Sequence, residues 1–176
     1  MLDMLRKLIG QPTKPAAAPA PAPSTLRQGS IPPPRAPSYD SGLVPALKND
    51  HQELVALFEQ IGRTYEARRF HEIPALLTAF KTRLEAHLLT ENVRFYNYVE
   101  STLRDDAENL SLIRDFRREM NTIARGVIDF VKKYQAHADA EALMHGFLAD
   151  YRTVGGLLVQ RIQREEGNLY PLYMPT

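Results

Sequence analysis

Hydrophobic side chains recur at alternating steps of three and four residues in four stretches of the chain, which is the spacing of one face of an α-helix. The first stretch carries Leu47, His51, Leu54, Phe58, Ile61 and Tyr65. The second carries Leu77, Phe80, Leu84, His87, Glu91 and Tyr98, with Phe95 beside them. The third carries Ile113, Phe116, Met120, Ile123, Val127, Phe130 and Tyr134, and the fourth carries Phe147, Tyr151, Val154, Leu158, Arg161 and Glu165. The pattern predicts four amphipathic helices, and no stretch favours a strand.

The connections between these stretches are short. Breaks in the pattern fall near residues 69–74, 101–106 and 136–139, and Ser41 is a suitable N-cap for the first helix. Short connections between long helices favour antiparallel neighbours. We therefore predict an all-α fold, an antiparallel up-down-up-down four-helix bundle in residues 41–176.

The first forty residues differ in composition from the rest of the chain. Nine of the 13 prolines lie between Pro12 and Pro37. Proline lacks a backbone donor and interrupts helices, so we expect residues 11–40 to be a flexible linker in a disordered tail, partly in polyproline II conformation. Residues 1–10 place their leucines near one side of a short helix. This segment is either a docking peptide for a protein partner or a membrane surface, or a frayed start without a function.

Composition excludes several classes of function. The chain has no cysteine, which excludes disulfides, thiolate metal sites and thiol catalysis. Its net charge is +1, with +3 in residues 1–42 and hence −2 in the rest, so the predicted bundle has no basic patch for nucleic acid. It contains no apolar run of 18 residues and no secretory signal, and we expect a cytoplasmic protein. No nucleophile elbow, phosphate-binding loop or cofactor motif is present, so we do not expect an enzyme.

Five polar residues interrupt the hydrophobic faces at positions that should point into the core. They are His51, His87, Glu91, Arg161 and Glu165. Buried ionisable groups are costly unless they are paired or bind a metal. His51 lies near the start of its helix and the others lie toward the ends of theirs. In an antiparallel bundle that rises about 1.5 Å per residue, all five can therefore reach one site.

His87 and Glu91 form an H-x-x-x-E pair, which places both side chains on one helix face. The sequence around this pair resembles the hemerythrin-like, or HHE cation-binding, family. The resemblance rests on Asn49-Asp50-His51, on His87-Leu-Leu-Thr-Glu91-Asn92 with Phe95-Tyr96, and on the segment from Arg164 to Tyr173 with its Leu-Tyr-Pro ending. It covers about residues 43–173. It implies a four-helix bundle that uses a non-haem di-iron centre to bind oxygen, or that serves in iron, oxygen or redox sensing.

The chain departs from the family pattern at two positions. Arg161 stands where the fourth helix usually has a histidine, and Met120 stands where the third helix usually has one. The resemblance then leaves His51, His87, Glu91 and Glu165 as metal ligands, a set suited to one divalent ion, with iron favoured. We expect a non-enzymatic protein that signals oxygen, redox or iron status to a protein partner.

An alternative needs no metal. The guanidinium of Arg161 can pair with Glu91 or Glu165, so the protein can supply its own buried cation. The bundle would then be a protein-interaction or regulatory module. The remaining histidines, His71, His137 and His145, lie in or near predicted loops and are not expected to be ligands. Gly155 and Gly156 lie within the fourth helix, where we expect them to allow close helix approach.

Overall fold

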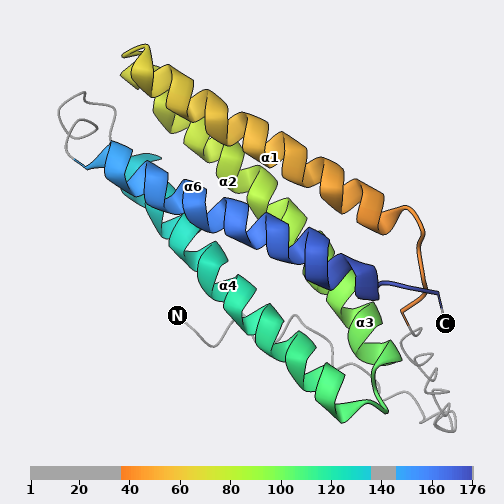
Figure 1. The fold of residues 1–176 in the computed structure, drawn as a ribbon. Helices are drawn as coiled ribbons and strands as arrows, with labels where there is room; N and C mark the ends of the chain where they lie inside the picture. The colour runs from red at the N-terminus through yellow and green to blue at the C-terminus, as the bar shows by residue number, and fades with distance from the viewer. Residues whose placement is uncertain (1–36, 136–145, 176) are drawn as a thin grey trace, which may run out of the picture. The chain divides into compact units, whose positions relative to one another are not determined.

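The structure is a computed structural model that describes residues 37–135 and 146–175, and these residues form helices without strands (Figure 1). The first hairpin contains α1 (Leu43–Glu66), the 3₁₀ turn η1 (Phe70–Glu72) and α2 (Ile73–Thr90). The π-helical turn η2 (Glu91–Tyr96) and α3 (Asn97–Thr102) continue α2. The second hairpin contains α4 (Ala107–Gln135) and α6 (Phe147–Arg164), followed by the π-helical turn η3 (Glu165–Leu169) and the 3₁₀ turn η4 (Tyr170–Leu172).

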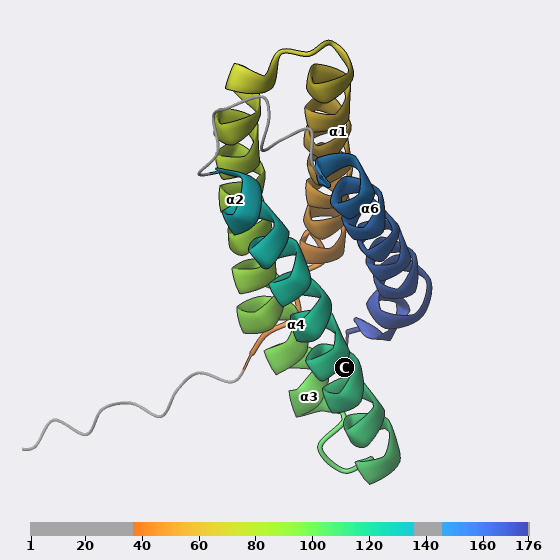
Figure 2. The ribbon, with the colours of Figure 1, turned by 90° about the vertical axis from the view of Figure 1, so that its left-hand side faces the viewer.

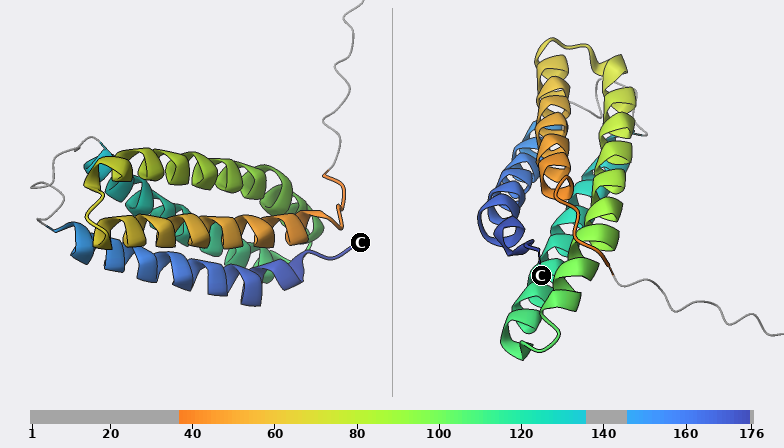
Figure 3. Two further views of the ribbon diagram at one scale, coloured as in Figure 1. Left: turned by 90° about the horizontal axis from the view of Figure 1, so that it is seen from above. Right: turned by 90° about the vertical axis from the view of Figure 1, so that its right-hand side faces the viewer.

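The four long helices alternate in direction, as the colour gradient in Figures 1 and 2 shows. Each packs on the next along the chain, and α6 returns to pack on α1, so the bundle closes (Figure 3). The predicted up-down-up-down bundle is therefore confirmed. The segments predicted as an amphipathic start (1–10) and most of the linker (11–36) lie outside the described residues, as do the break at 136–139, His137 and His145. None of the described helices has the length and hydropathy to cross a membrane.

The helix starts differ in detail from the sequence prediction. The N-cap of α1 is Gly42 rather than Ser41, and its N–H donates to Oδ1 of Asp40 at 2.9 Å. Prediction placed the cap one residue early because a serine is the stronger capping residue in isolation, whereas the Asp40 side chain organises this turn. Pro74 lies in the first turn of α2, where a missing backbone donor has no cost.

Two hydrophobic clusters fill the core, one on each side of a polar layer. One cluster lies toward the α1–α2 connection and includes Leu54, Leu84 and Leu158. The other lies toward the chain's C-terminal end and includes Leu47, Phe95, Leu169, Tyr170 and Tyr173. On α1, α2 and α6 the polar core residues fall between the two clusters in sequence. The antiparallel register therefore places them at one level of the bundle.

Tyr39 and Asp40, the last residues of the predicted linker, pack against the end of the bundle. The ring of Tyr39 stacks on Tyr173 at 5.1 Å, and the N–H of Asp40 donates to the hydroxyl of Tyr173 at 3.0 Å. The carboxylate of Asp40 also pairs with Arg94. These contacts connect the residues before α1 to η2 and to the segment after η4.

The structure confirms one of the two glycines expected to allow close helix approach and adds another. A Cβ atom at Gly155 would lie 3.1 Å from Phe58, but one at Gly156 would meet no atom within 4 Å. The tightest contact is at Gly62, where a Cβ would lie 2.5 Å from the Tyr151 hydroxyl. That hydroxyl donates to the carbonyl of Phe58 at 3.0 Å, and the Tyr151 ring stacks on Phe58 at 4.3 Å. Gly62 and Gly155 therefore allow α1 and α6 to pack around this aromatic pair.

Candidate metal centre

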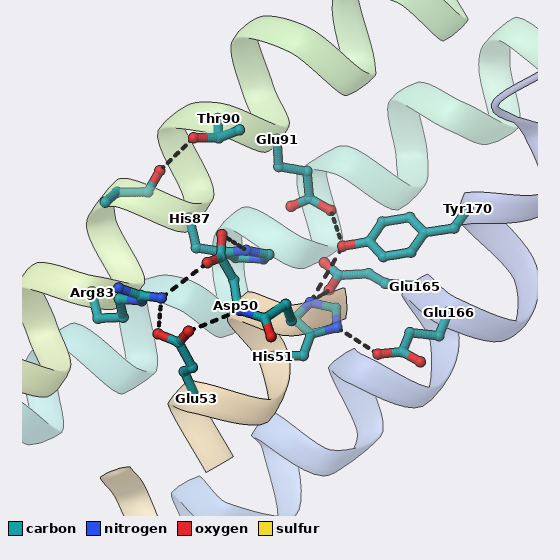
Figure 4. Close-up of polar contacts among 12 residues, drawn as sticks. Asp50, His51, Glu53, Arg83, His87, Thr90, Glu91, Glu165, Glu166 and Tyr170 are labelled. Atoms are coloured by element: carbon teal, nitrogen blue, oxygen red, sulfur yellow. Dashed lines mark hydrogen bonds and ion pairs between the residues drawn. The ribbon is translucent and has the colours of Figure 1, made fainter. Parts of the chain in front are cut away.

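Five ionisable side chains meet in the polar layer, and each is at most 3% exposed. His51 comes from α1, His87 from α2 and Arg161 from α6. Glu91 is the first residue of η2, and Glu165 is the first residue of η3. Figure 4 shows four of them with their polar neighbours. The structure therefore brings together the five residues that interrupt the hydrophobic faces.

Each carboxylate of this layer begins a π-helical turn. A π turn contains one more residue than an α turn, so it rotates the residues that follow it. The rotation lets two consecutive residues face the core, namely Phe95 with Tyr96 after Glu91, and Leu169 with Tyr170 after Glu165. The helix can then supply a carboxylate to the polar layer and a pair of large side chains to the cluster beyond it.

His51 has a carboxylate partner at each ring nitrogen. Its Nδ1 lies 2.8 Å from Oε1 of Glu166, and its Nε2 lies 3.1 Å from Oε2 of Glu165. Burial lowers the pKa of His51, but hydrogen bonds and attraction to the two carboxylates outweigh it, so the pKa is raised overall. Because Nδ1 donates to Glu166, Nε2 is the ring nitrogen that faces Glu165.

His87 is the least satisfied polar group of the layer. Its ring lies 4.8 Å from that of His51, and both of its nitrogens are buried without a hydrogen-bond partner among the described residues. Oδ2 of Asp50 is 3.6 Å from Nδ1, beyond hydrogen-bond distance. Burial, together with repulsion from His51 and Arg161, lowers the pKa of His87 to about 3. The imidazole is therefore neutral in ordinary conditions and has a free lone pair.

Arg161 joins the two carboxylates. Its Nη2 lies 2.7 Å from Oε2 of Glu91 and 2.5 Å from Oε1 of Glu165, and its Nη1 donates to the carbonyl of Met120 at 2.8 Å. The contacts of Glu165 have ion-pair distances but not the angles of good hydrogen bonds. Burial and repulsion from Glu165 raise the pKa of Glu91 to about 8, although Arg161 acts against this rise. One guanidinium thus serves two buried carboxylates.

A comparison with protein families matches residues 42–173 to the hemerythrin HHE cation binding domain. The chain belongs to this family. Searches of curated proteins and of solved structures found no match. The match covers the whole bundle, from the N-cap of α1 to the residue after η4.

Three of the four metal ligands expected in this hemerythrin-like bundle lie close enough together to hold one ion. The ligand atoms of His51, His87 and Glu165 lie within 4.8 Å of one another. Two imidazoles and one carboxylate are a donor set that binds iron and related divalent metals, and the unpartnered nitrogens of His87 fit a metal ligand. The fourth expected ligand, Glu91, lies beside them but is paired with Arg161. His71 is exposed and lies outside the layer.

Sequence reasoning missed the groups that surround the centre. Glu166 orients His51, and the ring of Tyr170 stacks on His51 at 5.7 Å with its hydroxyl 3.3 Å from Nε2. That hydroxyl also donates to Oε1 of Glu91 at 3.4 Å. Burial and the neighbouring carboxylates raise the pKa of Tyr170, so it remains a donor. Glu166 and Tyr170 both belong to the motif that carried the family resemblance. Only the structure, with its π turn at Glu165, shows that their side chains point toward His51.

Proposed function

We propose that this hemerythrin-like protein binds one metal ion between His51, His87 and Glu165, and that the state of this ion is its signal. The observation that carries the proposal is the pair of unpartnered ring nitrogens of His87. They are buried next to His51 and to the Glu165 carboxylate. A buried polar atom without a partner costs free energy, and coordination of a metal would remove that cost.

The surroundings of the histidines support a metal ligand role. Ligating histidines usually donate their second N–H to a carboxylate, which fixes the ring and its tautomer. Glu166 accepts such a bond from His51, and Asp50 lies in the corresponding place beside His87. Glu166 and Asp50 would thus orient the two imidazoles toward Glu165.

Arg161 favours a single ion over a bridged pair. Its guanidinium lies against both buried carboxylates, where a second cation would otherwise neutralise them. One guanidinium still leaves one carboxylate charge unmatched. A proton on Glu91, a proton on His51 or a bound cation can balance that charge.

Iron is the metal that this ligand set favours. Two histidines and one carboxylate bind non-haem iron with coordination positions left open, and bound iron would supply a reversible one-electron change. Zinc accepts a similar set, so the identity of the metal is part of the test. We propose a non-enzymatic cytoplasmic sensor of oxygen, redox or iron status that acts through a protein partner.

A metal-free function is the second candidate, and the Arg161 contacts favour it. In this alternative the guanidinium permanently replaces the metal charge, and the bundle is an interaction or regulatory module. Truncation of Arg161 to alanine would then leave two buried carboxylates unpaired, at a cost of about 3–5 kcal/mol of stability.

Elemental analysis separates the two candidates. The full-length protein is purified with and without air, and its metal content and optical spectrum are recorded. We expect about one iron per chain in the parent, a loss of metal in His87→Ala, and no change in His71→Ala, an exposed histidine of the first hairpin. A folded parent without metal under both conditions would contradict the metal proposal and leave the metal-free candidate.

A further inference from the structure

A cavity of about 250 Å³ lies beside the polar layer, between α1, α2 and α6. Its walls are mostly apolar and include Leu54, Phe58, Leu84 and Leu158. His51, His87 and Arg161 also line it. Its lining also includes Val55 and Val159, which are 37% and 50% exposed and mark its mouth. The cavity therefore connects the surface between α1 and α6 with the buried histidines.

We propose that this cavity is a binding site for a small neutral molecule with an apolar body and one hydroxyl-type head. The body would lie along Leu54, Phe58 and Leu158, and the head would bond to His87. The site adjoins the proposed metal centre and shares His87 with it, but its ligand binds through apolar contact and a hydrogen bond.

The size of the cavity limits the ligand. An apolar cavity of ~150 Å³ accommodates one benzene molecule. A cavity of about 250 Å³ therefore has room for roughly ten non-hydrogen atoms. Burial of an apolar body of that size supplies the main part of the binding free energy.

His87 provides the reason for a polar head. Its side chain is 2% exposed, it lines the cavity, and in the part of the chain that the structure describes neither ring nitrogen has a hydrogen-bond partner. A neutral imidazole offers one donor and one acceptor, and a hydroxyl can satisfy either. Water could satisfy them too, but it would leave the apolar walls hydrated.

The charged residues at the buried end of the cavity argue against a ligand with an ionic head group. The Nη2 of Arg161 already contacts Glu91 and Glu165 and its Nη1 donates to the carbonyl of Met120, so a carboxylate head would have to compete with these partners. An ammonium head would approach Arg161 itself, which lines the cavity. Either ion would also lose its hydration among apolar walls.

Three eight-carbon probes test the proposal. The full-length protein, as purified and after treatment with a chelator, is titrated by calorimetry with 1-octanol, octanoate and octylamine. We expect 1-octanol to bind the chelated protein saturably, with one site, and the two charged probes to bind at least about tenfold more weakly. Absence of saturable 1-octanol binding, or tighter binding of either charged probe, would overturn the proposal.

Two matched variants locate the site. Val159→Phe fills the mouth of the cavity and should weaken 1-octanol binding by at least about tenfold. Leu148→Phe introduces the same ring on α6 at a residue that is 37% exposed and does not line the cavity, and it should bind as the parent does. Equal affinity in Val159→Phe and the parent would place the ligand elsewhere and refute the site.

A third variant tests the hydrogen bond between His87 and the head group of the ligand. His87→Leu keeps an apolar filling of similar size, so the bundle should fold, and its melting temperature verifies this. We expect about tenfold weaker binding of 1-octanol from the loss of one buried hydrogen bond. Unchanged affinity would refute the role of His87. Because the titrations use chelated protein, their outcome does not depend on whether the protein binds iron.

Discussion

The Nη2 atom of Arg161 lies 2.7 Å from Oε2 of Glu91, so a guanidinium from α6 is ion-paired with a carboxylate at the end of α2. Arg161 stands four residues before Glu165, as His87 stands four residues before Glu91. The ends of α2 and α6 therefore have the same spacing, but α2 carries a neutral imidazole where α6 carries a cation. In the proposed one-metal centre, Arg161 takes the place of a second cation.

Replacing Arg161 by histidine should increase metal binding. Arg161→His restores an H-x-x-x-E pair on α6 and removes the guanidinium that engages Glu91, so both carboxylates become free to bind cations. We expect more iron per chain than in the parent, measured by elemental analysis of protein reconstituted under identical conditions. Equal or lower iron in a folded variant would contradict the assignment of Arg161 to the centre.

Glu166→Gln should weaken metal binding without unfolding the protein. Glu166 accepts the Nδ1–H of His51 and is 34% exposed, so the change alters the orientation and basicity of the ligand more than it alters the core. We expect a loss of about 10–100-fold in metal affinity by competition with a chelator. Glu85→Gln is the control, because Glu85 is an exposed carboxylate on α2 that pairs with Lys81. A similar loss in both variants would show a nonspecific charge effect.

The metal-free protein should be most stable at mildly acidic pH. The pKa of His87 is lowered from 6.5 to about 3, so the unfolded chain binds the extra proton between these values and stability falls as the pH falls. The pKa of Glu91 is raised from 4.5 to about 8, so the folded chain binds the extra proton and stability falls as the pH rises. Between pH 4.5 and 6.5 the two slopes cancel, which gives a plateau.

Urea unfolding in the presence of a chelator, at pH values from 3.5 to 8, measures this profile. His87→Leu should remove the loss of stability below about pH 4.5, because the unfolded chain no longer gains that proton. Its slope above pH 6.5 should remain, because Glu91 and the raised pKa of His51 both act there. A parent whose stability rises steadily from pH 6.5 to 8 would contradict the Glu91 assignment.

Two glycines of the bundle should respond oppositely to alanine. Gly62→Ala places a Cβ 2.5 Å from the Tyr151 hydroxyl, and the stacking of that ring on Phe58 restricts its movement. We expect a loss of about 1–3 kcal/mol in the free energy of unfolding. Gly156→Ala has open space within α6 and should gain about 0.5–1 kcal/mol from helix propensity. Chemical denaturation of both variants checks the pair, and equal effects would refute the packing argument.

The N-terminal segment is predicted to carry the partner contact. Leu5→Asp with Leu8→Asp introduces charge on the hydrophobic side predicted for residues 1–10, whereas Asp3→Asn leaves that side intact. We expect cross-linking in cells to lose its protein adducts in the double variant only, with the melting temperature of the bundle unchanged. Retention of all adducts would contradict a docking role, and loss of binding to anionic vesicles instead would identify a membrane contact.

The sequence by itself determined the fold and the composition of the polar layer. The three- and four-residue steps assign each helix its buried face, and hydrophobic burial makes that face the core because few other arrangements hide it. The same steps marked His51, His87, Glu91, Arg161 and Glu165 as core residues, and all five are buried. The motifs around them gave the family, which the comparison confirmed.

Only the tertiary structure decided which of these five side chains pair with one another. Arg161 can reach Glu91 or Glu165 in sequence terms, and the folded bundle gives it both, with the carbonyl of Met120 on α4 as a third partner. The π turns cannot be read from periodicity, because the helical segments that follow them are too short to show the new phase. The π turn at Glu165 directs Tyr170 onto His51, and these two residues lie 119 positions apart in the chain. Pairing at this range is set by the geometry of packed helices, which local sequence does not encode.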